Sequence, residues 1–328
     1  MLYFVIYSIL AIVLSIFFKK SFFLPNHTGD DHQLFSNQNN IPLVGGIYLI
    51  IPVIFMNYQN HYYSILIIFI FLLGFFSDLK ILSSAKKRFI FQIIIVLLSV
   101  FFLDLEILSS KLIFFDNFLK NHFFNIFFTS FCLLILINGS NFIDGLNGLL
   151  LFNMALIITI LLKLNLVNEY FINKDLLFYF IFFIIILLIL NLFNLLMLGD
   201  AGAYTLSFFV GFLIIKCHNF NPNISPYFFI TLLWYPCFEN LFSIIRKIKS
   251  KFSPLTPDNN HLHHLIYTNL KRKINKNKLV TNNISSFFIS FANLLIILIS
   301  SVNPYNSVYQ LKIIIFSILI YSILYLIL

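Results

Sequence analysis

Long apolar stretches separated by short polar segments dominate the chain. Eleven stretches reach or approach the length of about 20 residues that an α-helix needs to cross a bilayer, and few charged residues fall near their middles. They cover residues 2–19, 41–58, 62–79, 88–106, 123–138, 145–163, 175–194, 201–218, 226–245, 284–302 and 308–327. The pattern predicts an all-α, polytopic integral membrane protein with about eleven transmembrane helices in a single transmembrane domain over residues 1–328.

Composition supports a membrane protein and excludes a water-soluble fold. Of the 328 residues, 60% are hydrophobic and 10% are charged, whereas soluble domains carry about 25% charged residues. The cysteines Cys132, Cys217 and Cys237 are far apart, so they indicate small buried residues rather than a metal site or a disulfide framework. The first apolar run precedes Lys19 and Lys20, which is the reverse of a cleavable signal peptide and favours a first span with its N-terminus outside.

The loops between the predicted spans divide into two sets of very different charge. One set consists of loops near residues 20–40, 80–88, 138–148, 195–202 and 246–283. It contains all but six of the 21 Lys and Arg residues, the exceptions being Lys111, Lys120, Lys163, Lys174, Lys216 and Lys312. Because cytoplasmic loops are enriched in Lys and Arg, this set is predicted to be cytoplasmic, with the N-terminus outside and the active site on the cytoplasmic face.

The segment Asn138–Leu149, NGSNFIDGLNGL, is a polar interruption between two long apolar runs. Ionisable groups at membrane depth are costly, so Asp144 indicates a functional site. Asn138, Asn141, Asp144 and Asn147 recur every three residues with glycines between them. This spacing drifts around a helix, so a loop folded around a small polar ligand is predicted rather than a straight helix.

Asp78 ends the third predicted span, on the same side of the membrane as Asp144. The fourth span opens with three cations, Lys86, Lys87 and Arg88. An alternative interpretation is structural, with the cations anchoring the helix at lipid headgroups and Asp78 pairing with one of them.

Asp200 lies in LGDAGAY at the start of the eighth predicted span, shortly after Asn191 and Asn194. A carboxylate at a helix N-terminus can be only a cap, so this motif alone leaves a structural role open.

The longest cytoplasmic loop contains PDNNHLHHL, which carries His261, His263 and His264 downstream of Arg246. A zinc site is one alternative, but no cysteine is near and the histidine spacing suits a tetrahedral site poorly. Imidazoles beside basic residues suit a phosphate or diphosphate better. A solvated basic loop would explain the lysines but not the clustered histidines.

Aspartates, amides, glycine turns and cations on one face together describe a Mg²⁺–diphosphate site. Mg²⁺ takes oxygen ligands from one or two carboxylates and from substrate phosphates. Phosphoryl transfer then depends mainly on positioning and charge neutralisation.

The motifs PLVGG, GFFSD, NGSNFIDGLNGL, GDAG and PDNNHLHH occur in this order between Pro42 and His264. In this the chain resembles the polyprenyl-phosphate N-acetylhexosamine-1-phosphate transferases of glycosyltransferase family 4, the superfamily of phospho-MurNAc-pentapeptide translocase. The resemblance implies an enzyme of the bacterial inner (plasma) membrane that transfers a sugar-1-phosphate from a UDP-amino sugar to a polyprenyl phosphate such as undecaprenyl phosphate. UMP is released and a lipid-linked cell-surface glycan begins. Mg²⁺, with Mn²⁺ as a substitute, is the implied cofactor. No nucleic-acid partner is expected. The sequence is silent on the oligomeric state, and a homodimer is one alternative.

The resemblance also implies roles for individual residues. Asp200 is expected to be the main Mg²⁺ ligand, with Asp144 organising the metal or holding uridine, and Asp78 is expected between the two phosphates. The implied catalytic residues are thus Asp78, Asp144 and Asp200, and the implied substrate-binding residues are Asn138, Asn141, Asn147, Asn191, Arg246, His261, His263, His264, Lys86, Lys87 and Arg88.

Three positions depart from the family pattern. Ser77 stands where the first of two paired aspartates is usual, Asn37 where a histidine is common, and Leu195 where a cation is usual. The missing aspartate is the residue often proposed as the base, yet a phosphate monoester has a second pKa of about 6 and is largely dianionic without help. The departures fit either a subfamily with a different sugar or a decayed enzyme.

Three competing classes remain to be weighed. A transporter or flippase for a lipid-linked sugar would place polar residues near the middle of broken spans, where this chain has few. An inactive scaffold would lose its metal ligands, yet Asp144 and Asp200 are present. An intramembrane metalloprotease would need HExxH within a span, and the sequence lacks that motif.

Overall fold

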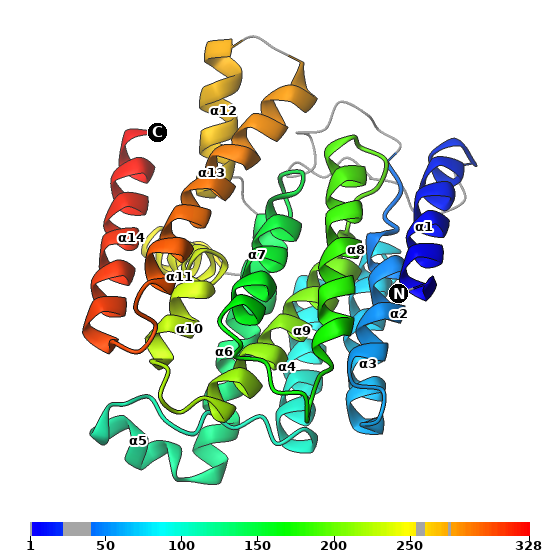
Figure 1. Ribbon diagram of the computed structural model, residues 1–328. Coiled ribbons are helices and arrows are strands. Elements are labelled where there is room, and N and C mark those ends of the chain that lie inside the picture. The colour runs from blue at the N-terminus through cyan, green and yellow to red at the C-terminus, as the bar shows by residue number, and fades with distance from the viewer. Residues whose placement is uncertain (1, 22–40, 254–259, 275–276) are drawn as a thin grey trace.

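The computed structural model describes residues 2–21, 41–253, 260–274 and 277–328, and within these ranges it contains helices but no β-strand (Figure 1). The predicted cytoplasmic segment around Asn37 and part of the histidine-containing loop lie outside the described residues. The helices are α1 (Leu2–Ser21), α2 (Gly45–Met56), α3 (His61–Asp78), α4 (Ala85–Phe102), α5 (Ile113–Leu119), α6 (His122–Ile143), α7 (Leu149–Lys163), α8 (Lys174–Leu192), α9 (Gly199–Phe220), α10 (Pro226–Leu232), α11 (Trp234–Lys249), α12 (Leu262–Ile274), α13 (Lys278–Ser301) and α14 (Ser307–Ile327).

Every predicted apolar stretch coincides with one or two of these helices. Seven described helices are long and apolar enough to cross a membrane, namely α1, α3, α6, α8, α9, α13 and α14. α2 and α7 are apolar but shorter, with 12 and 15 residues, and α4 begins with the cations Lys86, Lys87 and Arg88. The described part of the chain is therefore all-helical, and the length and composition of its helices are those of a polytopic membrane protein.

The predicted span over residues 226–245 is not one continuous helix. The structure contains α10 and α11 instead, bent by 78° at Leu233. Pro236 lies in the first turn of α11 and has no N–H to donate to the carbonyl one turn earlier, so the helix cannot continue straight. Figure 1 accordingly shows α11 almost along its axis, while most other helices are seen from the side.

Two predicted loops also contain helix. α6 continues to Ile143, so Asn138 and Asn141 lie on a helix and the connecting turn starts only at Asp144. The Asn138 side chain donates to the carbonyl of Leu134 at 2.8 Å, one helical turn earlier, which makes this polar residue compatible with helix. The predicted loop over 246–283 contains α12, whose basic C-terminal turn follows the histidine motif.

α9 is the central helix of the bundle. Every residue from Ala201 to Ile215 is buried, as expected for a helix surrounded by other helices rather than by lipid. α2, α3, α6 and α7 pack around it. α2 and α3 pack closely against α9 because they present glycines to it. A methyl group on Gly74 would lie 2.5 Å from the Ala201 Cα, and one on Gly46 would lie 2.6 Å from the Gly202 nitrogen.

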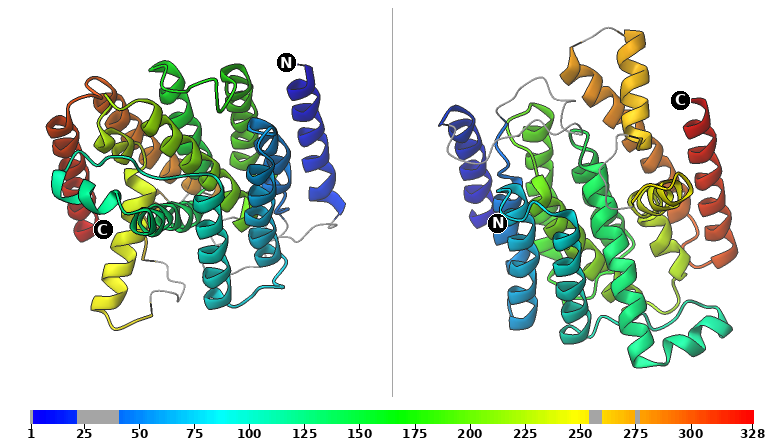
Figure 2. Two further views of the ribbon diagram at one scale, coloured as in Figure 1. Left: turned by 90° about the horizontal axis from the view of Figure 1, so that it is seen from below. Right: turned by 180° about the vertical axis from the view of Figure 1, so that it is seen from behind.

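The remaining helices flank this centre. α1 and α14 lie on opposite sides of the bundle in Figure 1 and in both views of Figure 2. α12 projects from one end of the bundle and α5 lies at the other. The end that carries α12 is called the α12 end below.

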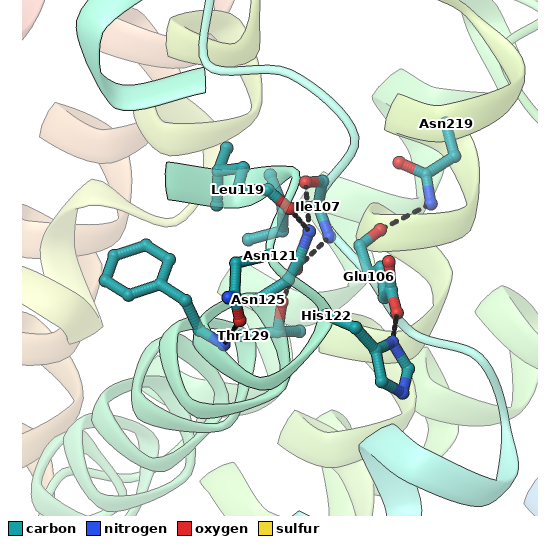
Figure 3. Close-up of polar contacts among 9 residues, drawn as sticks. Glu106, Ile107, Leu119, Asn121, His122, Asn125, Thr129 and Asn219 are labelled. Carbon is teal, nitrogen blue, oxygen red and sulfur yellow. Dashed lines mark hydrogen bonds and ion pairs between the residues drawn. The ribbon is translucent and has the colours of Figure 1, made fainter. Parts of the chain in front are cut away.

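Asn125 organises the opposite end, near α5 (Figure 3). Its amide donates to the carbonyls of Ile107 and Leu119 at 2.9 and 3.0 Å, and its carbonyl accepts from the Ile107 N–H at 3.0 Å. Next to it, Glu106 contacts the His122 ring. These contacts connect the α4–α5 segment to α6.

Candidate functional site

Asp78 and Asp200, which are 122 positions apart, meet at the α12 end where α3 ends and α9 begins. The Asp78 carboxylate accepts the N–H groups of Asp200 at 2.8 Å and of Ala201 at 3.0 Å. These N–H groups have no partner within α9, and the N-terminus of a helix also favours negative charge. Asp78 is therefore the cap of α9, and this contact determines where Asp200 lies.

Gly199 makes this capping contact possible. Its φ of +69° lies in the left-handed region, which residues with a Cβ adopt only at an energetic cost. A methyl group there would also lie 2.6 Å from the Asp78 Oδ2. The Gly–Asp pair in this motif thus has a physical explanation, since only glycine allows the Asp78 carboxylate to approach.

The PLVGG motif holds the same segment from the other side. The Met197 N–H donates to the carbonyl of Pro42 at 2.9 Å, and the N–H groups of Gly45 and Gly46 donate to the carbonyls of Met197 and Leu198 at 3.0 and 3.2 Å. These bonds position the backbone that leads to Asp200.

Arg88 and Ser77 contact the Asp200 carboxylate directly. Arg88 donates to the Asp200 Oδ2 at 2.8 Å, the Ser77 hydroxyl donates to the same oxygen at 2.5 Å, and Arg88 also contacts Ser77. Of the three predicted cations at the start of α4, Arg88 is half-buried in this contact, while Lys86 and Lys87 are exposed. Ser77, absent from the predicted site residues, is therefore part of it.

Asp144 follows the last residue of α6 and is half-buried. Limited contact with solvent raises the pKa of the Asp144 carboxyl well above its usual range, and the negative charges of Asp200 and Asp78 raise it further. The three aspartates thus form one cluster of interacting negative charges.

Gly145 brings the histidine motif to this cluster. A methyl group on Gly145 would lie 3.0 Å from the His264 Nε2 and 3.2 Å from the His263 Nε2. Both rings therefore approach the turn that begins at Asp144. The predicted convergence of the NGSNFIDGLNGL and HLHH motifs agrees with this geometry.

His263 is buried without a polar partner. Neither of its ring nitrogens has a hydrogen-bond partner among the described residues. Burial lowers the pKa of His263 well below its usual range, and the neighbouring His264 and His261 lower it further. A buried polar group normally has a partner, so the orphaned ring is a candidate contact for a ligand.

Asn147 and Asn191 brace the turn after Asp144. The Asn147 side-chain amide donates to the side-chain oxygen of Asn194 at 2.7 Å. The Asn191 side-chain oxygen accepts the Gly148 N–H at 2.5 Å. The Asn147 N–H in turn donates to the Asn282 side chain at 2.8 Å. The structure thus gives these predicted substrate-binding residues protein partners that hold the turn in place.

The other predicted amides and Arg246 are placed differently. Asn138 donates to the Gln92 side chain at 2.9 Å, whereas Asn141 is half-buried and makes no side-chain hydrogen bond with another described residue. Arg246, in the last turn of α11, donates to the Tyr325 hydroxyl at 3.2 Å. Only Asn141 among these presents a side chain that the described contacts do not occupy.

Glu239, on α11, is a site residue that the sequence prediction missed. Its carboxylate is 1% exposed and contacts the His261 Nδ1 at 2.9 Å and the Tyr321 hydroxyl at 2.9 Å. A signal was present, because a carboxylate inside an apolar stretch is costly and is a functional hypothesis by itself.

The donor set fits a divalent cation that prefers oxygen. The described residues contain no group of three or more His, Cys, Asp and Glu placed to hold a metal ion by themselves. Mg²⁺ needs fewer protein ligands, because one or two carboxylates and the substrate phosphates suffice. The charge of Asp200 acts unfavourably on the Asp144 carboxylate, and a bound cation would offset this effect.

Fold and site together define a class: a polytopic membrane protein in which carboxylates and histidines from several helices meet at one end of the bundle. Residues 60–218 match the family model of glycosyl transferase family 4. The chain carries this family's sequence across α3 to α9, and the resemblance is confirmed. The match includes Asp78, Asp144 and Asp200, while the histidine motif follows it. No curated protein matches the chain.

Proposed function

We propose that the protein transfers an N-acetylhexosamine-1-phosphate from a UDP-sugar to a polyprenyl phosphate, with release of UMP. The observation that carries the proposal is the convergence, within and beside the family 4 segment, of Asp78, Asp144, Asp200 and Arg88 with the histidine motif. Anionic ligands of several charges need this combination of carboxylates for a cation and cationic or neutral donors for phosphate oxygens.

In the proposed reaction, an oxygen of the lipid phosphate forms a bond to the β-phosphorus of the UDP-sugar. The bond from this phosphorus to the bridging oxygen breaks, and UMP leaves with that oxygen. The lipid phosphate is largely dianionic near neutral pH, so the attack does not require a carboxylate at position 77. Arg88, His263 and His264 lie beside the aspartates and supply donors for the diphosphate oxygens.

Asp200 and Asp144 would hold Mg²⁺, or Mn²⁺ in its place. When bound, the cation supplies positive charge for the diphosphate and for the leaving UMP. Asp78 contributes by holding the first turn of α9, and hence Asp200, in a fixed position. Asn141 and the turn from Asp144 are available for the nucleotide or the sugar.

The lipid acceptor would approach along α11. Leu241, Ile245 and Ile248 repeat at a helical spacing and are exposed on this helix, while Arg246 and Lys249 lie in its last turn. An amphipathic helix with basic residues suits the interface between hydrocarbon and headgroups. Its first half carries Glu239, which contacts His261, so the proposed lipid route leads to the site.

The proposed topology has eleven spans, an external N-terminus and the α12 end in the cytoplasm of a bacterium. The excess of Lys and Arg in the connecting segments at the α12 end supports it. The UDP-sugar would then enter from the cytoplasm, and the product would begin a lipid-linked cell-surface glycan.

The test is an assay of the purified protein with undecaprenyl phosphate and radiolabelled UDP-sugars, including UDP-GlcNAc, UDP-FucNAc and UDP-QuiNAc. We expect a lipid-linked product with one of them, equimolar UMP, and loss of both when EDTA removes divalent cations. Recovery of activity on adding Mg²⁺ controls for damage by the chelator. If no UDP-amino sugar yields a lipid-linked product, the transferase proposal is wrong.

Substitutions of Ser77 test whether this chain needs a base at that position. Ser77→Ala removes one hydrogen bond to Asp200 but leaves Arg88 in contact, so we expect a loss of about 2- to 10-fold in turnover. Ser77→Asp places a second carboxylate beside the Asp200 oxygen, where repulsion should cost more than that. Initial rates of UMP release measure both. An increase in turnover for Ser77→Asp would show that a carboxylate base improves the reaction.

A further inference from the structure

Glu239 has a carboxylate with partners on both oxygens in a nearly dry environment. Oε1 contacts the His261 Nδ1 at 2.9 Å and accepts the Leu262 N–H at 3.3 Å. Oε2 accepts the Tyr321 hydroxyl at 2.9 Å. The contacts connect α11 to the start of α12 and to α14.

A buried carboxylate is costly unless it is hydrogen-bonded or paired. The simplest role for Glu239 would be structural, because its contacts with Leu262 and Tyr321 hold α11 against α12 and α14. The contact with His261 does more than brace the helices, because this residue opens the histidine motif of the site.

The Glu239–His261 contact favours one tautomer of the histidine. The Glu239 Oε1 lies 2.9 Å from the His261 Nδ1, and a carboxylate oxygen is a good acceptor for a proton on that nitrogen. The geometry therefore points to a proton on Nδ1. Carboxylates that orient a functional histidine in this way fix both its tautomer and its ring plane.

The His261 ring contacts other residues of the site. Its ring is stacked on that of His263, with centroids 5.5 Å apart and planes 14° apart. Its ring also packs against that of Phe142, two residues before Asp144, with centroids 4.8 Å apart. Rotation of the His261 ring would disturb both the orphaned His263 and the end of α6.

We infer that Glu239 is a positioning residue for the proposed phosphoryl transfer: it holds His261 with the proton on Nδ1 and thereby sets the geometry of the histidine motif. This inference rests on the proposed function for its catalytic consequence. The placement of the proton and the ring is inferred from the contacts of His261 and can be tested without turnover.

A double-mutant cycle separates positioning through His261 from bracing. In Glu239→Gln the side chain keeps its shape, but its amide can present either oxygen or NH₂ to the ring, so the proton on Nδ1 is no longer imposed. We expect kcat to fall by about 10- to 100-fold, the range typical for residues that orient a ligating or functional histidine. The KM for the UDP-sugar should change by less than about 3-fold, since Glu239 acts through His261.

His261→Asn is the second variant of the cycle, because its amide can replace the Nδ1–H donor to Glu239 while Nε2 is lost. In this background Glu239→Gln should cause no further loss of kcat. Full wild-type kcat in Glu239→Gln, or losses that multiply in the double variant, would overturn the inference.

Tyr321→Phe is the matched structural control, because it removes the other side-chain hydrogen bond of Glu239 and leaves His261 in place. We expect a lower thermal unfolding temperature but a kcat within about 2-fold of wild type, as for a single hydrogen bond away from the site. If kcat of Tyr321→Phe fell as much as that of Glu239→Gln, Glu239 would act as a structural brace and not through His261.

The ¹⁵N chemical shifts of histidine-labelled protein provide the readout that does not depend on turnover. The His261 signals are assigned by their loss in His261→Asn. We expect a protonated Nδ1 in the wild type and a mixture of tautomers in Glu239→Gln. An unprotonated Nδ1 in the wild type overturns the inference even if the transferase is active. An inactive wild type with a protonated Nδ1 refutes the proposed function but not the positioning of His261.

Discussion

Asp200→Asn is expected to reduce turnover by at least about 100-fold while the membrane fold stays intact. The Asp200 carboxylate accepts from Arg88 and Ser77 and lies in the electrostatic cluster with Asp144. Asparagine has the same shape and leaves the backbone N–H that Asp78 accepts, so α9 should still begin correctly. The negative charge for a cation is lost, and such charges at a reacting centre contribute a factor of about 10² to 10³ or more.

The rate of UMP release and the thermal unfolding temperature in detergent check this expectation together. Asp116→Asn is a suitable control, because Asp116 accepts hydrogen bonds from Ser109 and Ser110 and lies at the end opposite the site. It should keep wild-type turnover. Full activity in Asp200→Asn would show that the proposed metal ligand is misassigned.

Gly199→Ala is expected to cost both stability and activity. A left-handed conformation costs a residue with a Cβ about 1–2 kcal/mol. The methyl group would also lie 2.6 Å from the Asp78 Oδ2, and loss of a helix cap costs about 0.5–2 kcal/mol. The sum is about 1.5–4 kcal/mol of unfolding free energy. Because Asp78 must move, Asp200 is displaced as well, and a displacement of about 1 Å can cost 100-fold in rate.

Gly148→Ala is the control that separates strain of the backbone from displacement of the Asp78 side chain. Gly148 also has a positive φ, +75°, but a methyl group there would meet the flexible Leu192 side chain at 3.2 Å. We expect a smaller loss in stability, about 1–2 kcal/mol from the backbone alone, and a smaller loss in the rate of UMP release. If the two variants lost turnover equally, displacement of Asp78 would not be the reason for the effect of Gly199→Ala.

Local properties of the chain explain why so much could be predicted from sequence. Membrane helices require long apolar runs, and each predicted run coincides with helix. Carboxylates are costly beside such runs, so Asp78, Asp144 and Asp200 were conspicuous, and the structure brings their charges together. The family 4 model matches residues 60–218, a range that includes these three aspartates.

Other features depend on contacts between distant segments and were not predictable from local patterns. Three adjacent cations look alike in sequence, but only the approach of α3 and α9 decides that Arg88, rather than Lys86 or Lys87, contacts Asp200. The 78° bend between α10 and α11 was likewise not predicted.

The sequence by itself determined the class of protein, the helical runs and the residue types of the site, because solvation in a bilayer and phosphate chemistry restrict composition strongly. The tertiary structure alone decided the roles of individual side chains. Asp78 became the cap of α9 and Glu239 the partner of His261. The physical reason is that hydrogen bonds are directional and short, so the residue that makes them is chosen by the packing of helices far apart in the chain.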